Sequence, residues 1–161
     1  MRHGRAESFA AEDHLRRLTE KGAREAQDAG EWLATHELHP THAYVSSVAR
    51  AQDTWAGLAA GSRSRVEPVY DDALYTAGPE NAMDILRSVP DEAEVVLYVG
   101  HNPTAASLAH LLDDGDPDPA SFRAMSAGFP TSAMAVLDVR VPWAELDAAT
   151  GRLVRFYPGH R

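Results

Sequence analysis

The stretch Glu94-Val95-Val96-Leu97-Tyr98-Val99-Gly100-His101-Asn102-Pro103 decides the fold class. Its first six residues form an almost continuous apolar run, which is typical of a strand buried on both faces of a parallel sheet. A polar turn follows at residues 100–103, and a helix is predicted from there through Leu112. A buried strand that turns directly into a helix is the repeating unit of α/β domains.

The same alternation of strands and helices extends outward in both directions. Helices are predicted over residues 19–33, 48–60, 79–86 and 103–112, with Gly61 ending the second of them. Strands are predicted over residues 43–45, 66–70 and 94–99, and a late antiparallel pair over 132–139 and 152–157. Residues 113–119 are rich in Gly, Pro and Asp and read as a surface loop. We therefore predict a single α/β domain over residues 1–161, with three α/β/α layers and a mostly parallel sheet.

The composition limits the classes of function. Hydrophobic residues make up 44% of the 161 residues and charged residues 24%, as in ordinary globular domains. No apolar run approaches the ~20 residues that span a bilayer, and no signal peptide opens the chain, so neither a membrane nor export is expected. Cysteine is absent, which excludes disulfides and thiolate chemistry, and a cytoplasmic location fits. A formal net charge of −9 disfavours nucleic acid as a partner, because such binding depends on Lys and Arg neutralising phosphates.

Polar clusters stand at three places where a strand ends and a helix begins. They are Arg2-His3-Gly4, Ser46-Ser47-Val48-Ala49-Arg50 and Gly100-His101-Asn102-Pro103. Ligands of open α/β sheets bind outside the carboxyl ends of the strands, so all three clusters are expected to line one crevice. Arginine forks and the free N–H groups of a helix N-terminus both suit phosphate oxygens. Two histidines and two arginines around an anion indicate a phosphoryl-transfer site.

Each cluster also has a simpler interpretation. A histidine at a strand end is commonly a hydrogen-bonded structural residue, and an arginine just after a strand is commonly a solvated charge. No G-x-S-x-G motif surrounds Ser46 and Ser47, so we interpret them as a helix cap and a turn residue. A zinc site made of His3, His101 and a carboxylate is disfavoured, because two arginines would stand beside the metal.

The three clusters, in their order and spacing, resemble the histidine phosphatase superfamily. The motifs that carry the resemblance are Arg2-His3-Gly4, Ser47-Val48-Ala49-Arg50-Ala51-Gln52-Asp53-Thr54 and Val99-Gly100-His101-Asn102-Pro103. The stretch Asp13–Gly22 resembles the D-x-x-R-P-L-T-x-x-G segment of the small phosphohistidine phosphatase (SixA-type) branch, with Arg17 in the proline position, and residues 74–77 also resemble that branch. The resemblance implies a phosphoglycerate-mutase-like fold.

The resemblance also implies roles for individual residues. His3 would be the nucleophile that takes the phosphoryl group as a phosphohistidine, with Arg2, Arg50 and His101 holding its oxygens. Further residues of the phosphate and substrate site would be Gly4, Arg16 and Asn102. No metal ion or other cofactor is required by such a mechanism, since phosphoryl transfer depends mainly on positioning and charge stabilisation.

The proton donor is the least determined of these roles. Larger members of the superfamily carry a carboxylate after the third strand, which predicts Asp72 here, with Asp71 and Glu80 as alternatives. A phosphohistidine substrate whose ring nitrogen carries a proton is already a good leaving group and needs no such acid.

Members of the superfamily normally have an apolar strand directly before Arg-His-Gly. The sequence begins at Met1, so we expect that strand to be missing or shortened. The activity expected is that of a metal-independent phosphatase acting through a phosphohistidine intermediate on phosphohistidine in proteins. The alternatives are a phosphatase of small phosphorylated metabolites and a catalytically weak phosphate-binding module.

Overall fold

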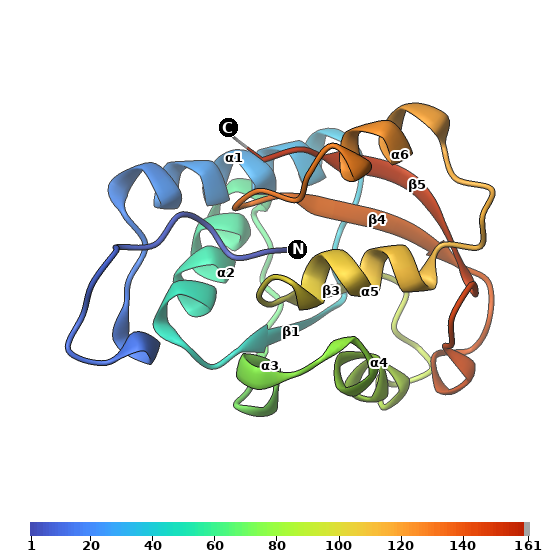
Figure 1. Ribbon diagram of the computed structural model, residues 1–161, viewed down its shortest axis with the longest axis horizontal. Helices are drawn as coiled ribbons and strands as arrows, with labels where there is room; N and C mark the ends of the chain where they lie inside the picture. Colours follow the sequence, from blue (N-terminus) through green and yellow to red (C-terminus); the bar gives the residue numbers. More distant parts are fainter. Residues whose placement is uncertain (160–161) are drawn as a thin grey trace.

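The computed structural model describes residues 1–159, which form layers of helices on both faces of a sheet (Figure 1). Three parallel strands lie in the order β2-β1-β3. They are β1 (His42–Ser46), β2 (Val69–Asp71) and β3 (Val96–Val99). The antiparallel pair β4 (Met134–Val139) and β5 (Gly151–Tyr157) lies beside them. The predicted parallel sheet and the predicted late antiparallel pair are both confirmed.

The residues Met1–His3 join the two groups of strands. On one side, the His3 N–H donates to the Gly100 carbonyl at 2.9 Å and the Gly100 N–H donates to the Met1 carbonyl at 3.0 Å. On the other side, the Arg2 N–H donates to the Ala133 carbonyl at 3.0 Å. The backbone of His3 is therefore held within the sheet, next to the end of β3.

Helices pack on both faces of the sheet, as the three-layer prediction requires. One face is covered by α1 (Glu20–Thr35) and α2 (Ala49–Ser62). The other is covered by α3 (Ala73–Thr76), α4 (Pro79–Arg87), α5 (Thr104–Leu112) and α6 (Pro119–Ser126). Two short 3₁₀ turns complete the chain, η1 (Asp13–Leu15) and η2 (Trp143–Glu145). Each face has its own apolar core, one around Val45, Trp55 and Leu58 and one around Leu74, Met83 and Leu153.

Glycines bring the backbones of α1 and α2 into direct contact. A Cβ added to Gly30 would lie 2.2 Å from the Leu58 carbonyl oxygen, and one added to Gly61 would lie 2.1 Å from the Gln27 carbonyl oxygen. The prediction that Gly61 ends α2 is wrong, because this glycine serves the close approach of two helices. The helix continues through Ser62 and is ended by Arg63, whose φ of 56° is left-handed.

Two other elements differ from their predicted extents. The strand predicted at residues 66–70 is confined to β2 at Val69–Asp71, where it pairs with β1. Helix α6 was missed. Its start signal is visible, since the Asp118 carboxylate accepts the Ser121 N–H at 2.8 Å and Pro119 occupies the first turn. The Gly/Pro/Asp-rich residues before it do form a loop, and the helix follows directly.

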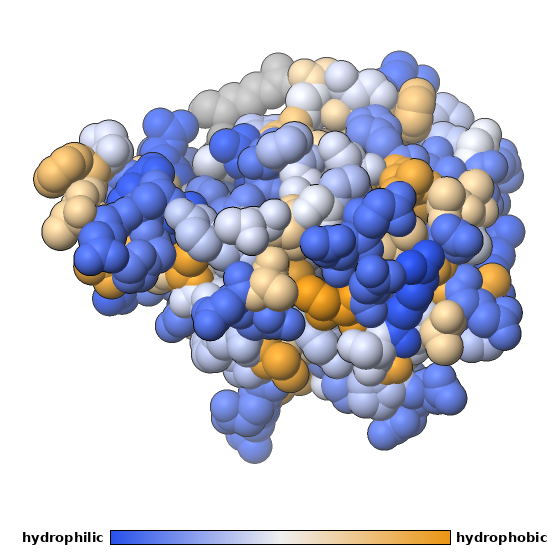
Figure 2. Space-filling model, turned by 60° about the horizontal axis from the view of Figure 1, so that its bottom comes forward, coloured by the Kyte–Doolittle hydropathy of each residue, from blue (hydrophilic) through white to orange (hydrophobic). Residues whose placement is uncertain are grey.

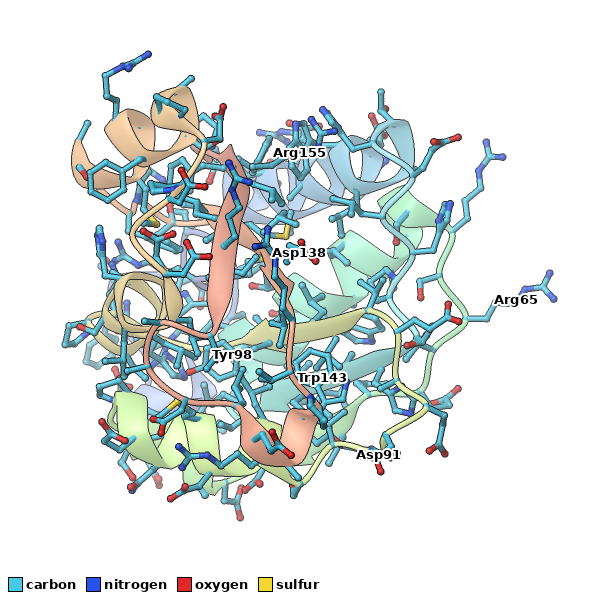
Figure 3. The ribbon with its side chains drawn as sticks, turned by 90° about the vertical axis from the view of Figure 1, so that its right-hand side faces the viewer. Arg65, Asp91, Tyr98, Asp138, Trp143 and Arg155 are labelled. Atoms are coloured by element: carbon cyan, nitrogen blue, oxygen red, sulfur yellow. The ribbon has the colours of Figure 1, made fainter. Side chains whose placement is uncertain are left out.

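An apolar cavity of about 510 Å³ lies between β3 and β4, bounded by α1, α5 and η2. Tyr98, Asp138 and Trp143 line it from three different elements (Figure 3). The Trp143 indole N–H donates to the Ala93 carbonyl at 2.8 Å, which ties η2 to the segment before β3.

The outer surface is mainly hydrophilic, with small separate apolar patches on the face shown in Figure 2. Among its large hydrophobic side chains, Phe9 is 82% exposed. Over residues 1–159, no helix has the length and apolar character needed to cross a membrane.

Candidate active site

The three predicted clusters do meet at one edge of the sheet. The ring centroids of His3 and His101 are 5.0 Å apart, and those of Tyr75 and His101 are 5.6 Å apart. The Arg50 guanidinium carbon lies 5.6 Å from the centroid of the Tyr75 ring. Parallel strands end at the same edge, and this edge therefore collects His101 after β3, Arg50 after β1 and Tyr75 after β2.

His3 is held in one tautomer. Its Nδ1 lies 2.7 Å from the Gly4 carbonyl oxygen, so Nδ1 carries the proton and donates it. The lone pair of Nε2 is then free to act as a nucleophile. Burial, together with the charges of Arg50, Arg2 and Arg16, outweighs the hydrogen bond to Gly4 and lowers the pKa of His3 to about 4. The ring is therefore neutral at neutral pH.

The turn after His3 is fixed to α2 by a threonine. The Gly4 N–H donates to Thr54 Oγ1 at 2.9 Å, and that hydroxyl donates to the Arg50 carbonyl at 2.6 Å. Both residues of the Arg50–Thr54 pair are buried. A Cβ on Gly4 would lie 3.0 Å from the Gly22 carbonyl oxygen, so this turn also packs tightly on the start of α1.

His101 is oriented by a buried serine. Its Nε2 lies 2.9 Å from Ser46 Oγ, at the end of β1, which leaves Nδ1 for a ligand. Burial, together with His3 and the charge of Arg50, lowers the pKa of His101 to about 3. The predicted helix-cap role is wrong, since the N-cap of α2 is Val48 with no side-chain cap, whereas Ser47 does lie in the turn between β1 and α2. Ser46 instead points into the site.

Arg2 and Asn102 share one anchor. Arg2 Nη1 and Asn102 Nδ2 donate to the Phe129 carbonyl at 3.0 and 2.9 Å. The Arg2 Nε atom is buried without a hydrogen-bond partner in residues 1–159, and burial lowers the pKa of Arg2. These contacts place Arg2 beside the histidines and commit the Asn102 amide to the protein backbone.

Arg50 is paired with a carboxylate that sequence reasoning missed. Arg50 Nη1 donates to the Asp13 carbonyl at 2.8 Å, and Arg50 Nη2 donates to Asp13 Oδ2 at 3.0 Å. The Arg50 side chain is 7% exposed, whereas that of Asp13 is 50% exposed. The signal for Asp13 was its place in the D-x-x-R segment, but only Arg16 of that segment was assigned to the site.

Two further donors hold Asp13. The Tyr75 hydroxyl donates to Oδ2 at 2.6 Å, and Arg16 Nη1 donates to Oδ1 at 2.9 Å. The hydrogen bonds from Tyr75 and Arg16, together with the charge of Arg50, hold the pKa of Asp13 far below its usual range. Arg16 is thus joined to the site through Asp13, and its predicted contact with phosphate or substrate stays a prediction.

The three predicted proton donors stand at the end of β2 (Asp71), directly after it (Asp72) and in the first turn of α4 (Glu80). Asp71 Oδ1 accepts the Ala73 N–H at 2.8 Å, and both Asp72 and Glu80 are exposed near the starts of α3 and α4. Within residues 1–159, none of the three carboxylates bonds to either histidine or to an arginine of the site.

The charges of the cluster suit a phosphoryl dianion. Three guanidinium groups (Arg2, Arg16 and Arg50) against the Asp13 carboxylate leave two net positive charges, because both histidines are neutral. The zinc site considered for His3 and His101 is not assembled, since residues 1–159 contain no group of three His, Asp or Glu side chains placed to hold a metal ion. The arrangement can bind a phosphoryl group and offer it the Nε2 of His3.

Comparisons with known proteins agree with this geometry. The family model of the histidine phosphatase superfamily (branch 1) matches residues 1–75. An uncharacterized protein of Mycobacterium leprae is 33% identical over 147 residues, which are 90% of this chain and 88% of that protein.

Two solved structures of candidate SixA phosphohistidine phosphatases are similar over almost the whole chain. The one from Nakamurella multipartitia has a TM-score of 0.85 and 31% identity, covering 98% of this chain and 92% of its own. The one from Agrobacterium tumefaciens has a TM-score of 0.80 and 29% identity, covering 98% and 94%. These similarities confirm the predicted phosphoglycerate-mutase-like α/β/α fold. The chain therefore belongs to the histidine phosphatase superfamily, among its SixA-type members, and is a phosphatase.

Proposed function

We propose that this phosphatase hydrolyses phosphohistidine in proteins, through a covalent phosphohistidine intermediate on His3 and without a metal ion. The observation that carries the proposal is the neutral His3 ring, with Nδ1–H bound to the Gly4 carbonyl and Nε2 free among three arginines. A lone pair held in one orientation beside an anion site is what nucleophilic catalysis requires.

The reaction then has two steps. The Nε2 lone pair of His3 attacks phosphorus while the bond from phosphorus to the substrate breaks, and the electron pair of that bond leaves with the substrate. Arg2, Arg50 and His101 stabilise the charge on the transferring oxygens; the His101 ring carries its proton on Nδ1 for this role, with Nε2 accepting from the Ser46 hydroxyl. In the second step water attacks phosphorus as the bond from phosphorus to His3 Nε2 breaks. The electron pair of that bond returns to the ring, which is neutral again, and phosphate leaves with the oxygen and protons of the water.

Phosphohistidine is favoured as the substrate because, within residues 1–159, none of the predicted proton donors bonds to a histidine or arginine of the site. The carboxylate that is bonded to the site, Asp13, is held ionised by Tyr75, Arg16 and Arg50. An alkoxide leaving group would depart without a general acid, which is commonly worth about 10²–10⁴-fold in rate. A phosphohistidine whose second ring nitrogen is protonated leaves as neutral imidazole and needs no acid.

The covalent step is tested by quenching a reaction with a radiolabelled phosphodonor and mapping the modified peptide. We expect label on His3 that is labile in acid and stable in alkali, unlike a phosphoserine. His3→Ala should abolish label and turnover, while His101→Ala should reduce both without moving the label. His110→Ala, on the exposed part of α5, is the matched control and should change neither.

Substrate choice is tested by turnover of a phosphohistidine peptide against common phosphomonoesters. We expect a preference of about 100-fold or more for phosphohistidine, because the absence of a general acid costs an ester at least about 10²-fold in rate. The reverse preference would make the protein a small-molecule phosphomonoesterase. No turnover and no acid-labile label would make it a phosphate-binding module.

A further inference from the structure

The carboxylate of Asp13 is a negative charge at a site that is proposed to bind a negatively charged phosphoryl group. It lies on the solvent side of Arg50, half-exposed, while Arg50 itself is buried. Nucleophile and leaving group take opposite sides of phosphorus in phosphoryl transfer. We expect the leaving group of a bound substrate on the open side of the site, where the half-exposed side chain of Asp13 lies against the buried Arg50.

The carboxylate has one acceptor position left. Oδ2 accepts from Tyr75 at 2.6 Å and from Arg50 at 3.0 Å, and Oδ1 accepts from Arg16 at 2.9 Å. An ionised carboxylate accepts about four hydrogen bonds in all. Oδ1 therefore has one open acceptor position. The Asp13 side chain is 50% exposed, so a ligand at the mouth of the site can reach this position.

The groups that face Asp13 come from every element around it. They are Arg16 beyond η1, Arg50 of α2, Tyr75 of α3 and His101 after β3. The hydrogen bonds from Tyr75 and Arg16 and the charge of Arg50 hold the pKa of Asp13 far below its usual range. Asp13 is therefore a hydrogen-bond acceptor throughout the working pH range and never a donor.

We propose that Asp13 is a specificity-determining residue that accepts a hydrogen bond from the protonated ring nitrogen of the phosphohistidine substrate. This inference rests on the proposed function and names the residue that distinguishes phosphohistidine from a phosphomonoester. An ester presents no N–H at that position, and its leaving oxygen would instead meet a negative charge.

The proton and electron balance of the step is simple. The bond between the substrate nitrogen and phosphorus breaks as the bond from His3 Nε2 to phosphorus forms. The electron pair of the broken bond returns to the substrate ring, cancelling the positive charge that its other, protonated nitrogen had given it. Asp13 takes no proton; it keeps the bound ring protonated until that bond breaks.

The test compares wild type with Asp13→Asn, which keeps the shape and removes the charge. We expect kcat/KM for a phosphohistidine peptide to fall about 10- to 100-fold, the range for losing a hydrogen bond to a charged group. The value for an aromatic phosphomonoester should fall less than threefold or rise, so the ratio of the two substrates should fall at least several-fold.

A pH profile provides a readout that a structural role would not change. Alkaline loss of kcat reports deprotonation of the ring in the bound substrate. We expect Asp13→Asn to move that loss to lower pH by about one unit, the equivalent of a tenfold change in proton affinity. The alkaline limb of kcat/KM, which reports the free substrate, should stay in place.

Asp53→Asn is the matched control. Asp53 Oδ2 accepts from Arg17 Nε at 2.7 Å and from the Leu18 N–H at 3.1 Å, so it anchors the same loop to α2 without touching Arg50. An equal change of the substrate ratio in Asp53→Asn would show that loop placement, rather than the charge of Asp13, sets the preference.

The outcomes separate this inference from the proposed function. If the wild type prefers phosphohistidine and Asp13→Asn leaves both the ratio and the kcat profile unchanged, the inference is wrong and the proposed function stands. If the wild type shows no preference for phosphohistidine, both are wrong.

Discussion

At the scale of single residues, the two histidines of the site are neutral because they are buried among arginines. The pKa of His3 is lowered to about 4 and that of His101 to about 3, against ordinary values near 6.5. A ring that resists protonation keeps its lone pair across the whole neutral range, which is what the proposed role of His3 as nucleophile needs.

This burial predicts a loss of stability in acid. Between about pH 6.5 and pH 4 the unfolded chain binds protons on His3 and His101 that the folded protein does not bind. The free energy of unfolding should therefore fall as the pH is lowered through this window, and the loss should be complete below the folded pKa values. Denaturant unfolding at several pH values measures it. His3→Gln should flatten the slope, and an unchanged slope in that variant would contradict the assignment.

Arg50 should be hard to replace. Its two Nη groups bond to the main chain and side chain of Asp13, and in the proposed mechanism its charge stabilises the phosphoryl group. Arg50→Ala should lower kcat by about 10²–10³-fold, as for other preorganised donors. Arg50→Lys should recover only part, because a point charge cannot make the forked contacts. Steady-state kinetics on one substrate are sufficient, and near-normal turnover of Arg50→Ala would remove this residue from the site.

At the scale of elements, the backbone contact between α1 and α2 predicts a sharp difference between glycines. Gly30→Ala places a Cβ 2.2 Å from the Leu58 carbonyl oxygen, where nothing flexible can move aside. We expect a loss of at least about 1–3 kcal/mol, the usual cost of overpacking a well-packed interior. Gly78→Ala meets nothing within 4 Å and should stay within about 0.5 kcal/mol of wild type. Thermal or denaturant unfolding of both variants makes the comparison.

The elements show which features could be predicted from the sequence. Strands such as β3 could be predicted because a short run of apolar residues is typical of a strand buried on both faces. The helices could be predicted because polar turns and caps separate them from the strands. The role of Gly61 was misjudged, because a glycine that permits a close helix contact looks the same in sequence as one that ends a helix. Helix α6 was overlooked because its composition resembles the loop before it, although Asp118 and Pro119 give a start signal.

At the scale of the whole molecule, the convergence of the three clusters followed from a rule of parallel sheets, without any knowledge of distances. What the rule could not supply was the contribution of segments outside the strands. Asp13 reaches Arg50 from a turn 37 residues away in the chain, and the Phe129 carbonyl that holds Arg2 is 127 residues away. Such contacts depend on how loops settle on the finished sheet, and no local pattern encodes them.

The backbone contact of α1 and α2 also bears on how the molecule opens. The backbones of α1 and α2 touch with no side chains between them, so opening one helix exposes the other. We therefore expect their amide hydrogens to exchange with solvent as one cooperative unit. Inorganic phosphate bound at Arg50, in the first turn of α2, should therefore slow exchange throughout α1 as well, in proportion to its occupancy. Hydrogen exchange followed by mass spectrometry would record this as equal added protection in both helices. Protection confined to α2 would mean that the two helices open separately. A ligand bound by Arg50 would thus slow amide exchange in α1, although no residue of α1 needs to contact the ligand.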